Sequence, residues 1–125
     1  MTFDMARPHY ILPLAGKEYQ LLGTFALIEA VELVMREYVG SVAVRVVNGM
    51  PSHETAKLLS VILTSSGHPV TTEEAKELIW RDGVANQVTR MHLYSFLKIC
   101  LAPPGQREAA ATEMGELMGS LKASL

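Results

Sequence analysis

The sequence predicts a mainly α-helical protein: an N-terminal β-hairpin, a compact bundle of four to five helices, and a C-terminal amphipathic helix. Three observations support this fold class. Two short strand-like segments meet at a glycine near the N-terminus, helix start and stop signals recur from residue 24 to residue 83, and apolar residues then follow a helical period. The 125 residues suit one domain with a core of its own.

We divide the chain into three parts. Residues 1–9 are expected to be a flexible N-terminus. Residues 10–101 are expected to form the hairpin and the helical domain. Residues 102–125 contain a linker, Ala102-Pro103-Pro104-Gly105, and the C-terminal helix.

The hairpin is expected from strands over residues 10–14 and 18–22. Gly16 followed by Lys17 fits a two-residue loop with glycine in its first position. Pro13 has no N–H to donate, so its strand is expected at a sheet edge. An isolated hairpin is marginal in water, and we therefore expect it to pack on the helices or to pair with another copy.

Thr24 is predicted to cap a helix over residues 25–39 that ends at Gly40. Its inward stripe is expected to comprise Leu27, Ile28, Val31, Val34, Met35 and Tyr38.

The next segment, 41–48, is ambiguous. Its valines at 42, 44 and 46 alternate as in a strand, whereas Val42, Arg45 and Val46 also fit one short helix. Because β-branched residues favour strands, we predict a strand here, by a slight preference.

The clearest helix signals lie between residues 50 and 83. Ser52 is predicted to cap a helix that runs to about Ser65. Thr71 and Glu74 have the spacing of a capping box at the start of a helix over residues 72–82. Gly83 suits the end of that helix, since glycine adopts the left-handed conformation that terminates helices.

Two further helices are expected. The segment 84–101 is apolar over much of its circumference, which indicates the central helix of the core. Residues 106–123 can form an amphipathic helix with a narrow apolar face. Four residues of this face are our candidates for partner contact: Met114, Leu117, Met118 and Leu121. The alternative, that this face folds back on the domain's own core, is equally open.

No motif in the chain points to catalysis. The four histidines lack the spacing of metal ligands, and the glycines stand singly rather than in a phosphate-binding loop. Cys100, the only cysteine, lies among apolar residues as a buried small hydrophobe would. The carboxylates at 73, 74 and 77 are explained by a helix N-terminus, which favours negative charge. We therefore expect no enzyme activity, no cofactor and no metal.

The composition also argues against nucleic-acid and membrane binding. Charged residues make up 19% of the chain and the net charge is −2, so no basic footprint for nucleic acid is present. The helix over 72–82 would have to enter the DNA groove with three carboxylates, facing phosphates. Asp4 and the absence of an apolar segment argue against a signal peptide, and glutamates interrupt the most hydrophobic region. A cytoplasmic protein is expected.

Several stretches of the sequence, taken together, resemble a known family. They are the hairpin LxGKEYxL, the helix FALIEAVELV, and the pair SHETAKLLSVILTSSG and VTTEEAKELIWRDGV. In this order they are similar to the small tail-assembly chaperones of gene transfer agents and siphophage-like particles. The resemblance covers residues 10–101 and is strongest over 54–83.

The resemblance implies a non-enzymatic chaperone. Such proteins bind the tape-measure protein and the tail-tube protein during tail assembly, are absent from the finished particle, and in some cases self-associate. It therefore implies those two partners and a homo-oligomer. Two alternatives remain: a structural tail or head–tail component that stays in the particle, and an unrelated helical regulatory or binding protein.

Overall fold

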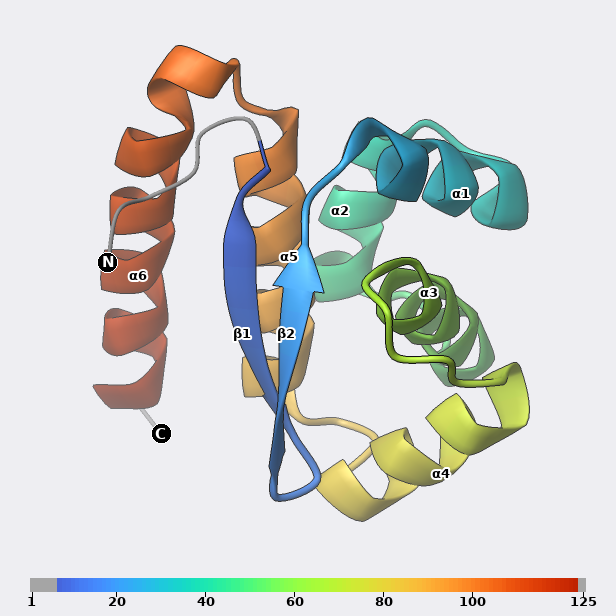
Figure 1. Cartoon of the computed structure of the whole chain (residues 1–125). Coiled ribbons are helices and arrows are strands. Elements are labelled where there is room, and N and C mark those ends of the chain that lie inside the picture. Colours follow the sequence, from blue (N-terminus) through green and yellow to red (C-terminus); the bar gives the residue numbers. More distant parts are fainter. Residues whose placement is uncertain (1–6, 124–125) are drawn as a thin grey trace.

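The computed structural model describes residues 7–123, and it confirms the predicted fold class: 69% of these residues are helical, with a two-stranded hairpin at the N-terminal end (Figure 1). The expectation of flexibility over 1–9 lies mostly outside the described residues, and His9 belongs to the first strand. The elements are β1 (His9–Leu14), β2 (Lys17–Leu22), α1 (Phe25–Met35), α2 (Val39–Asn48), α3 (Ser52–Ser65), α4 (Thr72–Asp82), α5 (Gln87–Leu101), the 3-10 turn η1 (Pro104–Gln106) and α6 (Arg107–Ala123).

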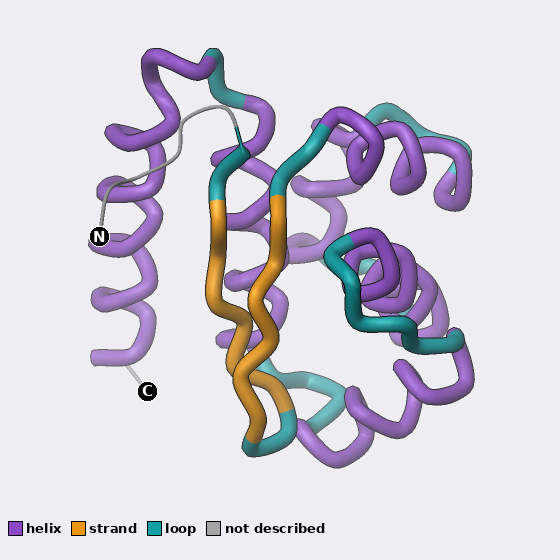
Figure 2. Tube along the Cα trace, viewed as in Figure 1, coloured by secondary structure: helices purple, strands orange, loops and turns teal. Residues whose placement is uncertain are grey.

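The hairpin is antiparallel, with a register that runs from His9 opposite Leu22 to Leu14 opposite Lys17. Its loop is Ala15-Gly16 rather than the predicted Gly16-Lys17, because Lys17 already pairs in the ladder. Both loop residues have positive φ, 51° and 80°, as the twist of a two-residue hairpin requires. The hairpin packs on the helices, as predicted: β1 lies along α5, and its loop reaches α4 (Figure 2).

The ambiguous segment 41–48 is helical, so the slight preference for a strand was wrong. Val42, Ala43 and Val46 are completely buried, and their spacing places them on one helical face, against α5. The N-terminus of α2 is also satisfied by a neighbour, since the Glu32 carboxylate accepts the Val39 N–H at 3.0 Å. Burial of this face outweighs the weak β preference of valine.

The prediction that Gly40 ends the first helix was wrong. Helix α1 ends at Met35, and Arg36 takes the left-handed conformation with φ 54°. Gly40 instead lies inside α2, where a Cβ would collide with the ring of Tyr38. The glycine is therefore explained by the close approach of this ring and not by helix termination.

An ion-pair cluster joins the segments around α2. The Arg45 guanidinium donates to the Glu37 carboxylate, with a shortest distance of 2.8 Å, and to the Glu54 carboxylate at 3.0 Å. These groups come from the α1–α2 turn, from α2 and from α3. The hydrogen bond from Arg45 lowers the pKa of Glu54. The cluster therefore links three consecutive parts of the chain at the partly exposed surface.

The signals around α3 and α4 are confirmed with one exception. Thr71 Oγ1 accepts the Glu74 N–H and the Thr71 N–H donates to the Glu74 carboxylate, both at 3.1 Å, which completes the capping box. Gly83 ends α4 with φ 104°. Ser52 does not cap α3, because it already lies in the helix and the Pro51 carbonyl accepts the first amide hydrogens.

Helix α5 begins three residues later than the predicted start, Val84, because Asn86 caps it. The Asn86 side-chain oxygen accepts the N–H groups of Val88 at 3.0 Å and Thr89 at 3.4 Å. The Asp82 carboxylate in turn accepts hydrogen bonds from the side chains of Asn86 and Thr89. From this start α5 runs through the middle of the fold, where β1, α2 and α6 all pack on it, as predicted for the central helix.

The capping box makes a local prediction. Replacement of Thr71 with alanine removes the acceptor for the Glu74 N–H and should lower the free energy of unfolding by about 1 kcal/mol. Urea denaturation followed by circular dichroism measures this loss. Thr112, an exposed threonine within α6, provides the matched control. The explanation fails if Thr71→Ala and Thr112→Ala have the same effect.

Candidate functional site: exposed apolar surfaces

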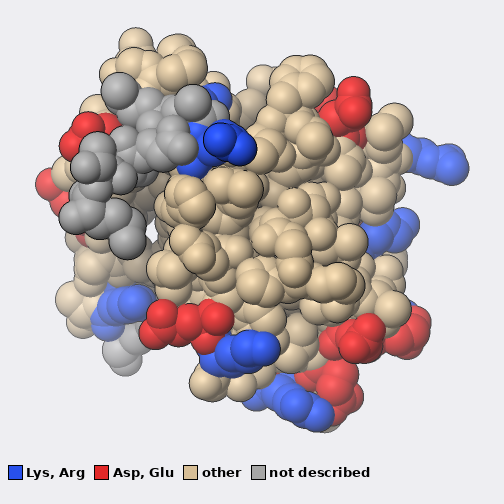
Figure 3. Space-filling model, in the orientation of Figure 1, with Lys and Arg blue, Asp and Glu red and all other residues tan. Residues whose placement is uncertain are grey.

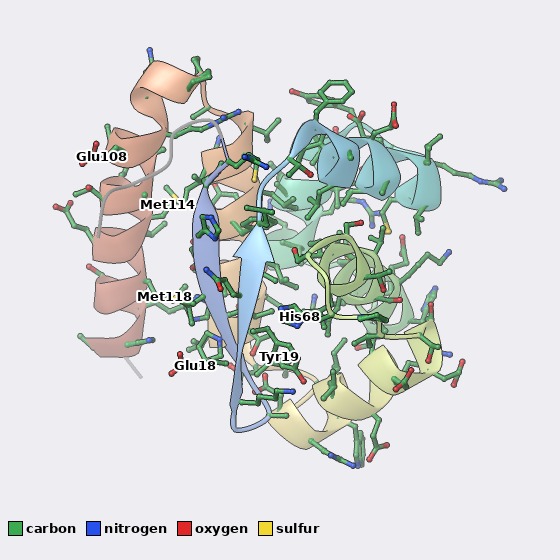
Figure 4. All side chains as sticks on the ribbon, in the orientation of Figure 1. Glu18, Tyr19, His68, Glu108, Met114 and Met118 are labelled. Carbon is green, nitrogen blue, oxygen red and sulfur yellow. The ribbon has the colours of Figure 1, made fainter. Side chains whose placement is uncertain are left out.

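The predicted contact residues of α6 divide between the interior and the surface. Met114 and Met118 are 8% and 6% exposed, and they point from α6 toward the hairpin and α5 (Figure 4). Leu121 is half-buried, whereas Leu117 is 42% exposed. The apolar face of α6 therefore folds back on the domain's own core along its two methionines, and Leu117 is the predicted residue that the fold leaves most accessible.

A partly buried hydrogen bond joins β1 to α5 near this contact. The Tyr10 hydroxyl lies 2.7 Å from His92 Nδ1, and His92 is only 7% exposed. Burial, with a smaller contribution from Lys122, lowers the pKa of His92 to about 4, while burial raises the pKa of Tyr10. At neutral pH both groups are therefore uncharged, and the pair positions β1 on α5.

The single cysteine and the potential metal ligands were the remaining candidates for a chemical site. Burial raises the pKa of Cys100 to about 12, so the thiol stays protonated, as suits a small hydrophobe in the core. Within residues 7–123 no group of three or more histidine, cysteine or acidic side chains could hold a metal ion. The surfaces left to consider are those that expose large apolar side chains.

The first such surface is the outer side of α1. All residues of α1 except Glu29 and Glu32 are apolar, yet only Leu27 and Val31 are fully buried. Phe25 is 82% exposed, at the start of the helix. The exposed residues of α1 also include Glu29, four residues after Phe25 on the same side of the helix. The outer side of α1 therefore combines large exposed apolar side chains with a carboxylate, and apolar patches bordered by polar residues are typical of interaction surfaces.

Leu33 is 73% exposed near the other end of α1, eight residues after Phe25 and on the same side of the helix. The predicted inward stripe was wrong at Val34 and Tyr38, which are 40% and 64% exposed. The stripe was too wide because α1 packs mainly on α3 along one side. The signal that could have revealed the surface is the nearly continuous apolar sequence of this helix.

The second surface is a groove beside α4, which we call the Trp80 groove. Trp80 is 73% exposed and borders a cavity of about 190 Å³. A neighbouring cavity of about 370 Å³ extends the groove toward the start of α5 and shares Ser52 and Val84 with the first. Its lining comprises Val47, Asn48, Gly49, Met50, Ser52, His53, Lys76, Ile79, Trp80, Val84, Ala85, Gln87 and Arg90. No pattern in the sequence pointed to this groove, because its lining residues come from four helices, α2 to α5, and adjoining turns.

Charged side chains lie mainly around the rim of the molecule in the view of Figure 3, while the middle of that view, over β2 and α3, is free of Lys, Arg, Asp and Glu. Tyr19 and His68 meet on this face with ring centroids 5.5 Å apart in a T-shaped arrangement (Figure 4). The face is weakly polar rather than strongly charged, which matches the low charge content of the chain.

The His92 environment predicts a loss of stability in acid. The pKa of His92 falls from 6.5 to about 4 on folding, so its stabilising effect is complete above pH 6.5 and is lost as the pH falls toward 4. The free energy of unfolding should therefore decrease less between pH 7 and pH 5 in His92→Gln than in the unaltered protein. Denaturant titrations at both pH values measure this difference. The exposed His53, changed to Gln, is the control; an unchanged pH dependence in His92→Gln would contradict the assignment.

Comparison with known protein families, with curated proteins and with solved structures finds no match. Among the helices that the structure describes, none combines the length and apolar character needed to cross a bilayer.

Proposed function

We propose that this chain is a non-enzymatic tail-assembly chaperone that acts in the bacterial cytoplasm and binds the tape-measure and tail-tube proteins of a phage-like tail. The observation that carries the proposal is the bare outer side of α1, with Phe25 and Leu33 82% and 73% exposed. The order of elements from the hairpin to α5 supports it, because the motifs that resemble this family lie on those elements.

The mechanism is transient burial of apolar surface. The resemblance implies that the tape-measure protein must be kept soluble until tube subunits polymerise around it, and association of an apolar part of that protein with α1 would remove both surfaces from water. Burial of apolar area contributes about 25 cal/mol per Å², so an isolated side chain binds weakly and several together bind reversibly. Such contacts suit a chaperone that must later be displaced by tube subunits.

The burial of Met114 and Met118 moves the proposed partner contact from α6 to α1. Because Met114 and Met118 are buried against the protein's own fold, α1 replaces them as the principal contact surface. Leu117 remains an accessory candidate at the edge of α6. The same exposed side of α1 is also available for self-association, and we therefore retain a homo-oligomer in the proposal, without nucleic-acid or membrane binding.

Co-expression with the tape-measure protein of the same gene cluster tests the proposal. The tape-measure protein should stay soluble and co-purify with this chain. Leu33→Asp should reduce the co-purified amount several-fold, since it places a charge in an apolar contact. Ser120→Asp, which adds the same charge at an exposed position of α6, should leave it unchanged.

Two outcomes would contradict the proposal. Co-purification that Leu33→Asp leaves intact would remove α1 from the contact, and failure to bind any tape-measure fragment would remove the chaperone function. Mass spectrometry of purified particles distinguishes the chaperone from the alternative, a structural tail or head–tail component. Stoichiometric amounts of this chain in mature particles would identify a structural component that is retained.

A further inference from the structure

The Trp80 groove lies where α4 packs on α3. The turn after Ser65 brings α4 back against α3, and His53 near the start of α3 and Trp80 near the end of α4 line the same cavity. The second cavity shares Ser52 and Val84 with the first and is lined by residues of the α2–α3 turn and the start of α5.

One end of the groove is apolar. Trp80 and Val84 are 73% and 38% exposed there, and Ile79 forms the floor. The indole of an exposed tryptophan offers a large, rigid contact area, and tryptophan is enriched among the residues that dominate binding energy at protein interfaces. The cavity of about 190 Å³ has room for a large apolar side chain of a partner.

The side chains that line the groove include cationic but no acidic ones, although Glu73, which is not part of the lining, pairs with Lys76 at 2.9 Å. The lining contains Lys76, Arg90 and His53 but no aspartate or glutamate, although the whole chain has 13 acidic and 11 basic residues. Arg90 donates to the carbonyl oxygens of Val46 at 3.2 Å and Met50 at 2.9 Å. These neutral acceptors orient the guanidinium and leave its charge uncompensated.

Lys76 is the second cation of the lining. Among residues 7–123 its ion-pair partner is Glu73, at 2.9 Å, and such exposed pairs contribute little free energy, so Lys76 can exchange Glu73 for a carboxylate of a partner. The groove therefore combines an apolar end with basic edges.

We propose that the Trp80 groove binds an acidic amphipathic helix of a partner protein. One apolar side chain of that helix enters the cavity beside Trp80, and its carboxylates face Lys76 and Arg90. Binding of an amphipathic helix in an apolar groove is a recurrent mode of recognition. The assignment does not depend on a role in tail assembly, because it rests on the lining of the groove.

Trp80 is the only tryptophan of the chain, so its fluorescence reports on the groove directly. The probe is a blocked peptide of sequence LEELLEELLEEL, and its counterpart LKKLLKKLLKKL keeps the apolar residues and reverses the charge. The acidic peptide should shift the emission to shorter wavelength in a saturable titration, and calorimetry should give the same affinity. The basic peptide should bind at least tenfold more weakly.

Two matched variants test whether the groove itself is responsible. Lys76→Glu and Arg81→Glu each reverse one charge on α4 and each break one exposed ion pair, but Arg81 borders a different cavity, beside Tyr19. Lys76→Glu should weaken binding of the acidic peptide about fivefold or more, as expected for a reversed contact charge, and Arg81→Glu should change it less than twofold.

Three results would overturn the inference. The first is the absence of a response to the acidic peptide in both fluorescence and calorimetry. The second is equal or tighter binding of the basic peptide. The third is equal weakening by Lys76→Glu and Arg81→Glu, which would indicate attraction by the overall field rather than by the groove. Co-purification of the tape-measure protein is a separate readout, so failure here leaves the proposed function standing.

Discussion

The structure depends on the burial of α5. Leu93, Phe96 and Leu97 are completely buried, and β1, α2 and α6 each pack on this one helix. A helix with apolar residues around most of its circumference must be covered on several sides to be stable in water. The hairpin, which would be marginal alone, gains its stability by covering one of these sides.

The covering of α5 also decides which surfaces remain bare. Met114 and Met118 of helix α6 cover one side of the core, so these two side chains are not accessible to a partner. Helices α1 and α4 lie farther out and pack mainly on α3, so Phe25, Leu33 and Trp80 stay exposed. Interaction surfaces therefore appear on the periphery, away from the helix that organises the fold.

The two bare surfaces differ in character. The outer side of α1 exposes Phe25 and Leu33 beside a single exposed carboxylate, Glu29, whereas the Trp80 groove places Lys76 and Arg90 beside an apolar cavity. Apolar burial supplies affinity, and charge complementarity supplies discrimination between partners. The two proposed contacts therefore lie at separate places on the domain and differ in what they would recognise.

Local signals in the sequence determined much of the fold. Thr71, Glu74 and Gly83 specify the ends of α4 through hydrogen bonds and a backbone conformation that involve only near neighbours, and the apolar circumference of α5 marked it as central. Only the tertiary structure decided that residues 41–48 are helical, that Met118 faces inward and that Trp80 faces water. These outcomes depend on which neighbour covers a given face, and residues distant in the sequence supply that neighbour.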